Sequence, residues 1–383
     1  MPFGRAIRDR FLLNPELAFL NNGSFGAMPR DILEVQNRLR LELEWEPVGF
    51  MFGAWLGGLR EAMKPVAEFL GADADDCVFV ENASSGVNAV LRSWELGPGD
   101  AILTTSHAYG AVRQALRYVC SRTGATLIEA EVPFPLSGPQ DVLDAVDRAW
   151  ADNVKLAVFD HISSATGLIY PVAELAERCR SRGALSVVDG AHVPGQISVE
   201  LRTLGVDFWV GNLHKWLYAP KGCAVLYVAP EHRDRVHPVV ISHGYGTGLA
   251  EEFDWVGTRD LTAWLAAPAC VAWVESIGAE AIRHYNHDLR RDGAALIRDA
   301  WGTSAPVPDA MLGCLATLDP PCHIPADADQ AAQVQRALFE RHQIVVPVVP
   351  FGDRSWIRIS AQIFNELDDY WRLAQAVGPD GVR

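Results

Sequence analysis

The stretch at residues 185–216, LSVVDGAHVPGQISVELRTLGVDFWVGNLHKW, contains two short apolar runs that each lead into polar residues. The first run, 185–188, ends at Asp189, and the second, 208–210, is followed after four residues by Lys215. Asp189 and Lys215 lie 26 positions apart (215 minus 189), which leaves room for one βα turn and the next strand. Because ligands bind at the carboxyl ends of parallel strands, we expect both side chains at one edge of a sheet.

Short apolar runs of this kind alternate with helical patterns through residues 78–228. This βαβα rhythm predicts an α/β fold with a mainly parallel sheet and helices on both faces. Buried strands are expected at 78–80, 101–104, 127–128, 156–159, 185–188 and 208–210, and helices at 86–94, 110–123, 139–151 and 171–182. The run 223–228 is expected to form an antiparallel strand.

Three regions follow from the change of pattern along the chain. Residues 1–20 form an N-terminal segment that packs against a domain or a second subunit, and residues 21–255 form a large domain. Residues 229–258 are rich in His, Gly and Pro without clear periodicity, which places the boundary near 255. The helical pattern at 260–300, followed by strands with a helix between them, predicts a small C-terminal α+β domain over 256–383.

Composition narrows the partners and the location. The net charge of −15 argues against a nucleic-acid partner, because cationic side chains make the contacts to phosphate. Seven scattered cysteines without a C-x-x-C pair are typical of free thiols in a reducing cytoplasm, not of disulfides or a zinc site. We see no signal-peptide pattern and no apolar run of membrane-spanning length, so we expect a cytoplasmic protein without a membrane partner.

Lys215 and Asp189 are the strongest candidates for chemistry. Lys215 follows an apolar strand, has aromatic neighbours and has no carboxylate nearby in sequence, and such surroundings lower the pKa of an amine toward the nucleophilic range. The other lysines, Lys64, Lys155 and Lys221, are expected to be solvated. An aspartate that ends an apolar strand needs a cation, and a protonated pyridine nitrogen is one such partner. Considered alone, Asp189 fits a helix N-cap equally well.

Other motifs complete a site for a phosphorylated ring and an amino acid. His192 follows Asp189 by three residues and could reach the ring's phenolic oxygen, and residues 81–86, ENASSG, form an anion cup at a helix start. Either His107 or Tyr109 could stack on the ring. Arg358, in an apolar strand, favours a bidentate anion such as a carboxylate. Each motif also has a purely structural alternative. The anion cup could be a capped helix start, the stacking residue could lie in a surface turn, and Arg358 could form an ion pair.

Taken together, these residues resemble the class V aminotransferase family of pyridoxal-phosphate (PLP) enzymes of fold type I, and within it the isopenicillin N epimerase-like branch. The resemblance covers nearly the whole chain and is carried by motifs in a fixed order. These motifs are FLNNGSFG (19–26), NASSG (82–86), AYGAV (108–112), DHISS (160–164), DGAH (189–192), NLHKW (212–216), GTRD (257–260) and RIS (358–360).

The resemblance implies a role for each matching residue. Lys215 holds PLP as a Schiff base and moves the Cα proton of an amino-acid substrate, and Asp189 pairs with the pyridinium. Tyr109 stacks on the ring, while His192 and Ser163 neighbour its phenolic oxygen. The implied phosphate ligands are Ser84, Ser85, Asn212 and His214, with Thr258 arriving from the other subunit of a homodimer. Arg358 binds the substrate carboxylate, helped by Asn22.

Two departures from the family pattern leave the substrate open. The family often has histidine where Asn22 stands, and residues 46–53 lack the arginine often found after the Pro-Val pair. The resemblance favours lyase chemistry (C–S β-elimination) or epimerisation. An aminotransferase or a decarboxylation-linked oxidative deaminase remains an alternative. So does a cysteine desulfurase, although Cys314 reads as buried in a strand and Cys322 follows two prolines, which are poor settings for a reactive thiol.

Two interpretations of other kinds were weighed. A metallohydrolase would use Asp160, His161, Asp189, His192 and His214. It lacks any recognised ligand spacing and leaves Lys215 without a role. A PLP-fold scaffold without catalysis is disfavoured because each catalytic position of the family pattern is present. We therefore expect PLP as cofactor and no metal.

Overall fold

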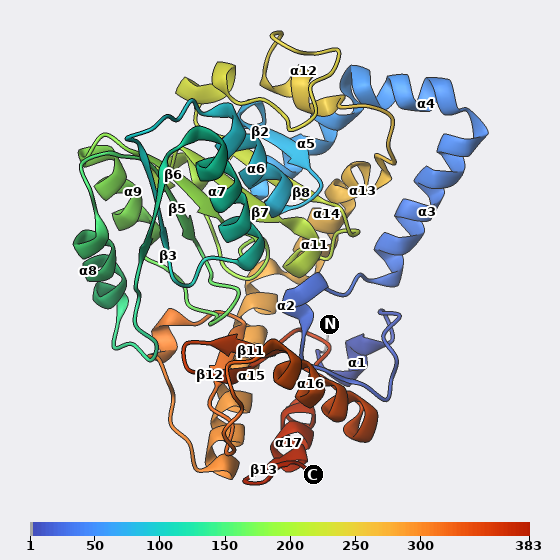
Figure 1. Cartoon of the computed structure of the whole chain (residues 1–383). Helices are drawn as coiled ribbons and strands as arrows, with labels where there is room; N and C mark the ends of the chain where they lie inside the picture. The colour runs from blue at the N-terminus through green and yellow to red at the C-terminus, as the bar shows by residue number, and fades with distance from the viewer. Residues whose placement is uncertain (1–2) are drawn as a thin grey trace.

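The computed structural model describes residues 3–383, and its centre is a seven-stranded sheet in the order β2-β8-β7-β6-β5-β3-β4 (Figure 1). The strands are β2 (Cys77–Val80), β3 (Ala101–Thr105), β4 (Thr126–Ala130), β5 (Val154–Asp160), β6 (Leu185–Asp189), β7 (Phe208–Asn212) and β8 (Ala224–Val228). Strands β3 to β7 pair in parallel. Strand β8 is antiparallel to both of its neighbours, β2 and β7. The expected mainly parallel sheet with one antiparallel insertion is confirmed.

Both faces of this sheet are covered because successive side chains of a strand point to opposite sides. In β7, Phe208 and Val210 belong to one apolar cluster, and Trp209 between them belongs to the other. The first cluster includes side chains of α6 (Ala83–Ser93) and α7 (Gly110–Thr123). The second includes side chains of α5 (Leu59–Phe69), α8 (Pro139–Ala149), α9 (Val172–Ser181) and α14 (Ala267–Ile277). Because each of these strands is buried on both of its faces, its sequence is continuously apolar.

The C-terminal domain is built on a smaller antiparallel sheet in the order β11-β12-β9. Its strands are β9 (Leu315–Leu318), β11 (Val348–Phe351) and β12 (Arg354–Ser360), and its helices are α15 (Ala279–Trp301), α16 (Ala328–His342) and α17 (Leu367–Ala376). Shorter elements elsewhere are α10 (Leu201–Leu204), α11 (Leu213–Trp216), η3 (Pro230–Arg235), α12 (Leu249–Asp254), α13 (Thr262–Leu265), β13 (Val377–Gly378) and β14 (Gly381–Val382). An antiparallel sheet with helices is the α+β arrangement expected for this part of the chain.

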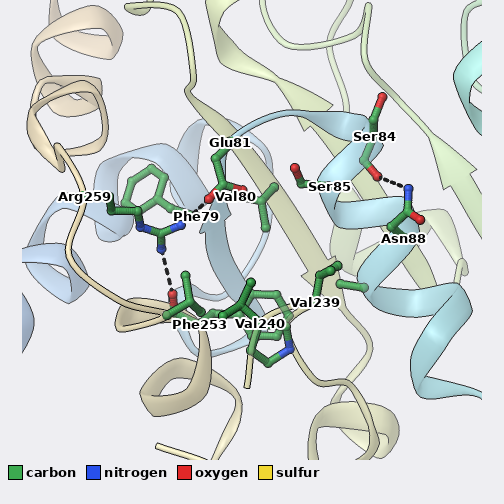
Figure 2. Close-up of a pocket in the computed structure, with 13 residues that line it drawn as sticks. Phe79, Val80, Glu81, Ser84, Ser85, Asn88, Val239, Val240, Phe253 and Arg259 are labelled. Atoms are coloured by element: carbon green, nitrogen blue, oxygen red, sulfur yellow. Dashed lines mark hydrogen bonds and ion pairs between the residues drawn. The ribbon is translucent and has the colours of Figure 1, made fainter. Parts of the chain in front are cut away.

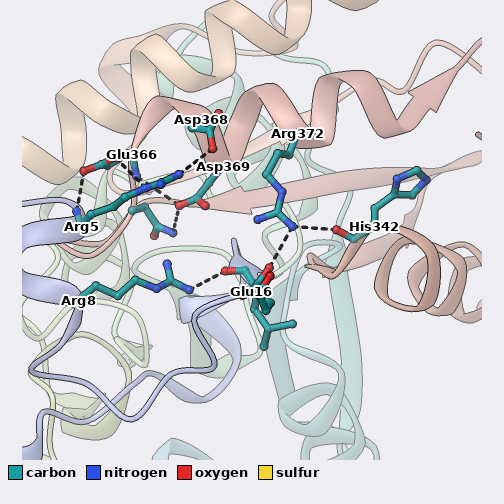
Figure 3. A network of polar contacts seen from close by, with 10 residues as sticks. Arg5, Arg8, Glu16, His342, Glu366, Asp368, Asp369 and Arg372 are labelled. Atoms are coloured by element: carbon teal, nitrogen blue, oxygen red, sulfur yellow. Dashed lines mark hydrogen bonds and ion pairs between the residues drawn. The ribbon is translucent and has the colours of Figure 1, made fainter.

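The N-terminal segment is fastened to the C-terminal domain. After α1 (Arg5–Arg8), the short β1 (Ala18–Phe19) pairs in parallel with β10 (Ile344–Val345). Figure 3 shows the polar contacts that surround this junction: the Arg5 guanidinium reaches Asp368 at 2.9 Å, and Arg372 donates to the main chain of both the N-terminal segment and His342. These contacts join the two ends of the chain.

Helices α2 (Asn22–Phe25), α3 (Arg30–Trp45) and α4 (Pro47–Gly53), followed by the π-helical turn η1 (Ala54–Gly58), connect the N-terminal segment to the large domain. Figure 1 shows α3 and α4 on the outside of the molecule, away from the central sheet. Large apolar side chains on these elements are exposed, and that of Trp45 is 90 % exposed. The others are Leu41, Val48, Phe52 and Leu56. We call these five side chains the α3–η1 apolar face.

Candidate active site

A cavity of about 460 Å³ opens at the carboxyl ends of the parallel strands. Asp160, Asp189 and Asn212 are the last residues of β5, β6 and β7, and all three line it. The predicted site residues in its wall are Ser84, Tyr109, Asp189, His192, Asn212, His214 and Lys215. The structure therefore brings together side chains that the sequence places at the ends of separate strands.

Lys215, on the short helix α11, is the amine of this cavity. Its Nζ lies 3.2 Å from Nε2 of His192. Burial lowers the pKa of Lys215 to about 8, with the Arg358 guanidinium adding to the effect and Asp189 opposing it. At pH 7 about a tenth of an amine with this pKa is neutral, far more than for an ordinary lysine, and a neutral amine can attack an aldehyde.

Two carboxyl groups lie side by side and interact electrostatically with the Lys215 amine. Asp160 and Asp189 are paired across β5 and β6. Burial raises the pKa of both, and each pKa is lowered in part by Lys215. Asp189 accepts a hydrogen bond from the Ala191 backbone at 3.0 Å, whereas Oδ2 of Asp160 is buried without a hydrogen-bond partner within residues 3–383. A cationic ring nitrogen fits this pair, because its positive charge would offset the cost of burying the ionised carboxylates.

Asp160 begins the DHISS motif, but the sequence assigned it no role in the PLP site and offered it only as a possible metal ligand. It ends an apolar strand in the same way as Asp189, and that shared pattern was the available signal. Lys221, in the turn before β8, is exposed as expected, and it also lines the cavity. Lys64 is exposed as well and is paired with Glu61 at 2.6 Å.

The anion cup forms where β2 meets α6. Asn82 caps the helix by accepting from the Ser85 backbone at 2.9 Å, and Asn212 accepts from the Ala83 backbone at 2.9 Å. Ser84 lines the cavity. His214 donates from Nδ1 to the Cys223 carbonyl at 3.1 Å, and burial lowers its pKa to about 4. The first turn of this eleven-residue helix suits a phosphate, because the positive end of the helix dipole lies there and Ser84 borders the cavity.

Ser85 does not line the main cavity. It faces a second hollow of about 430 Å³ on the other side of the same turn, which Ser84 also borders (Figure 2). In this hollow the Arg259 guanidinium is paired with Glu81 and donates to the Phe253 carbonyl at 3.2 Å. Ser84 therefore borders both hollows, whereas Ser85 borders only the second.

The structure separates the two aromatic candidates that the sequence left open. Tyr109 lines the cavity with 46 % of its surface exposed. His107 is buried and bonded to Thr166 at 3.0 Å and to the Val132 carbonyl at 3.1 Å, outside the cavity wall. Ser163 is fully buried, and its neighbour Ser164 lines the cavity instead.

Arg358, on β12, is only 5 % exposed and does not itself line the cavity, but it is bonded to Ser164, which does. Its Nη1 donates to the carbonyl of Ser164 and, at 3.3 Å, to the hydroxyl of the same residue. Its Nε is buried without a hydrogen-bond partner in the described part of the chain, and burial lowers its pKa to about 10, so it is a cation at neutral pH. An anionic substrate group would satisfy the free side of this fork.

Asn22 and Thr258 also lie outside the cavity wall. Asn22 is buried, donates to the Lys215 carbonyl at 2.9 Å and accepts from the Ala27 backbone at 3.1 Å, so its amide holds the main chain that carries Lys215. Thr258 lines a separate apolar pocket together with Phe52, Trp55 and Trp255.

The residues of the metallohydrolase interpretation do not converge. Among residues 3–383, the one set of three side chains whose ligand atoms lie within 4.8 Å of one another is Asp207, Glu231 and His232, outside the cavity. Asp160, His161, Asp189, His192 and His214 form no such set in the described chain.

PLP requires three groups of a protein: an amine that binds its aldehyde, a carboxylate that pairs with its ring nitrogen, and an anion site for its phosphate. This site supplies candidates for all three. With the α/β fold and the family match given next, this site defines a PLP-dependent enzyme of fold type I. The sequence matches the family described as aminotransferase class-V over residues 56–314, and the chain belongs to this family.

Known proteins similar to this chain carry out different reactions. The chain is 32 % identical to putative L-cysteine desulfhydrase 1 of Oryza sativa subsp. japonica, over 94 % of this chain and 82 % of that protein. It is also 32 % identical to isopenicillin N epimerase of Streptomyces clavuligerus, over 97 % of this chain and 96 % of that protein. The apo structure of cysteine desulfurase from Thermococcus onnurineus NA1 has the same fold, with a TM-score of 0.81 at 23 % identity over 98 % and 97 % of the two chains. The resemblance to the epimerase branch is thus confirmed.

Proposed function

We propose that this protein is a PLP-dependent C–S lyase that acts on L-cysteine or an S-substituted L-cysteine. In this reaction the bond between Cβ and sulfur breaks, sulfide or a thiol leaves, and water converts the remaining product to pyruvate and ammonia. The similarity to a desulfhydrase supports the proposal. The observation that carries it is the position of the cysteines relative to the cavity.

None of the seven cysteines lines the cavity. Cys314 is fully buried just before β9, its thiol contacts the Gln196 carbonyl at 3.9 Å, and burial raises its pKa well above the usual range. Burial also raises the pKa of Cys322. A thiol with a raised pKa is a poor nucleophile, so sulfur is expected to leave as a free product and not as a persulfide on the protein.

Each residue of the site has a task in this proposal. PLP, when bound, supplies the electron sink that makes the Cα proton removable. Asp189 keeps the ring nitrogen protonated, and Arg358 holds the substrate carboxylate so that the Cα–H bond faces Lys215. Lys215 would hold the cofactor through its amine and would accept the Cα proton of the substrate at Nζ.

The test is to incubate the purified enzyme with L-cysteine and quantify sulfide, pyruvate and ammonia. We expect the three products in equal amounts, and none from Lys215→Ala. Lys64→Ala is the matched control, because Lys64 is exposed and paired with Glu61. Borohydride reduction followed by peptide mapping should place the cofactor on Lys215. Sulfur retained on a protein cysteine, or reduction that labels Lys64, Lys155 or Lys221, would contradict the proposal.

Epimerisation is the second candidate, and the similarity to the Streptomyces epimerase over nearly both full lengths favours it. It uses the same Cα proton removal but returns a proton to the other face. An amino-acid and S-conjugate panel in deuterated water separates the two reactions. Inversion with deuterium at Cα and no thiol release would identify an epimerase, whereas thiol release without accumulation of the D-isomer identifies a lyase.

We propose further that the active unit is a homodimer in which Thr258 of each subunit contributes to the partner's cavity. Support comes from the position of Thr258, outside the cavity of its own chain, and from the α3–η1 apolar face. An exposed patch of this kind usually marks an interaction surface. Light scattering should show a dimer, and Trp45→Asp should weaken it.

A complementation experiment tests the sharing of sites. Lys215→Ala and Thr258→Ala subunits should each be impaired alone. When the two are mixed and allowed to exchange, each mixed dimer contains one cavity with both native residues, so activity should return. A mixture as inactive as its components would show that Thr258 serves its own chain.

No single helix within residues 3–383 is long and apolar enough to cross a membrane. One pair, Thr262–Ile277 with Ala279–Trp301, meets the length and composition test only jointly, across a 75° bend. We propose a cytoplasmic location, which cell fractionation with an antibody to the protein would test. The scattered free thiols support it.

A further inference from the structure

Trp216 makes a hydrogen bond that constrains His192. Its indole Nε1 lies 3.3 Å from Nδ1 of His192, while the other ring nitrogen, Nε2, lies 3.2 Å from Nζ of Lys215. Trp216 and His192 are each 1 % exposed. Gly23 of α2 packs against both rings, since a side chain there would lie 3.4 Å from His192 and 3.5 Å from Trp216. The imidazole is therefore enclosed, with one defined partner at each nitrogen.

The chemistry of these partners fixes the position of the imidazole proton. An indole N–H can only donate, so Nδ1 of His192 must be the acceptor and carries no proton. His192 is neutral, because burial, together with the nearby cations Lys215 and Arg358, lowers its pKa well below the ordinary value. A neutral imidazole has one N–H group, which must then be on Nε2.

We propose that Trp216 is a positioning residue that holds the His192 proton on Nε2, so that His192 presents a hydrogen-bond donor to the Lys215 amine. An ammonium group has no lone pair to accept this bond. The contact therefore favours the neutral, nucleophilic form of Lys215. Once Lys215 has bound the cofactor, the same Nε2–H remains a donor on that side of the cavity and cannot act as a base.

The other charged groups that face Lys215 act in opposite directions on its pKa. Asp189 and Asp160 both favour the ammonium form, and Arg358 opposes it. The donor on His192 adds to the effect of Arg358 and to burial. The role of Lys215 in cofactor binding rests on the proposed function, whereas the tautomer of His192 can be measured without cofactor.

The first test is the tautomer in the full-length protein labelled with ¹⁵N-histidine. Long-range ¹H–¹⁵N correlation should show His192 with a protonated Nε2 and an unprotonated Nδ1, both with and without PLP, at pH values of about 6 to 8. Disappearance of the signal in His192→Gln assigns it. A proton on Nδ1, or an imidazolium in this range, would overturn the proposal without any variant of Trp216.

The second test is Trp216→Phe, which removes the indole N–H and keeps an aromatic ring. The His192 tautomers should then interconvert, and the pH midpoint for capture of PLP by Lys215 should rise by about one unit. Trp209→Phe is the matched control, because Trp209 donates an equivalent bond at 3.2 Å to Nδ1 of His161, which does not line the cavity. It should leave the His192 signals and the midpoint unchanged.

The outcomes separate the two proposals. If PLP never becomes linked to Lys215, the proposed function fails, and the tautomer measured without cofactor still decides the role of Trp216. If PLP is captured normally but Trp216→Phe leaves both the tautomer and the midpoint as in the native protein, only the role of Trp216 is refuted.

Discussion

Replacing Arg358 by lysine tests how the substrate is held. The change keeps a positive charge in β12 but loses the planar fork, so a carboxylate can no longer be bound through two parallel N–H groups. In the native site Nη1 is already bonded to Ser164, and the buried Nε has no partner within residues 3–383. One hydrogen bond to a charged group contributes about 1.5–3 kcal/mol. Losing one arm of the fork predicts a fall in kcat/KM of about 10- to 150-fold.

The assay is steady-state thiol or pyruvate release at several substrate concentrations, with the PLP content of each variant measured by absorbance. Arg354→Lys is the matched control, because Arg354 lies on the same strand and is paired with Asp319 at 2.9 Å, outside the cavity. It should retain native kinetics. If Arg358→Lys has the kcat/KM of the native enzyme, or if both variants lose activity equally, Arg358 stabilises the C-terminal domain and does not bind substrate.

Three further predictions concern the Lys215 amine, the Asp160 carboxyl and the two C-terminal cysteines. Capture of PLP should accelerate with rising pH and level off above about pH 8, because Lys215 must be neutral to react; an equal rate at pH values of about 6 and 9 would contradict this. Folding raises the pKa of Asp160, so this group costs stability as pH rises above about 4. Asp160→Asn should therefore raise the Tm of the cofactor-free protein more at pH 8 than at about pH 5, and a larger gain at the lower pH would reverse the assigned sign. Replacing Cys314 and Cys322 together by serine should leave sulfide release within about twofold of native, and loss of turnover in a folded, PLP-loaded variant would favour a persulfide route.

Local patterns predicted much of the fold. Each expected strand of the large sheet appears within two residues of its predicted start, because strands buried on both faces are continuously apolar and bounded by polar turns. The order of these strands did not follow from the pattern. That β8 lies between β2 and β7 depends on which chain segments meet in space, and a local apolar run carries no information about its neighbour.

For the site, the sequence by itself determined that Asp189 and Lys215 share one edge of the sheet, since both follow strands that run in the same direction. Only the tertiary structure decided that Tyr109 and not His107 faces the cavity, and that Asp160 lies beside Asp189. It alone also placed the Trp216 indole against His192. The reason is geometric: a strand end fixes where a residue lies along the sheet, but a hydrogen bond between side chains depends on register and packing to a fraction of an ångström.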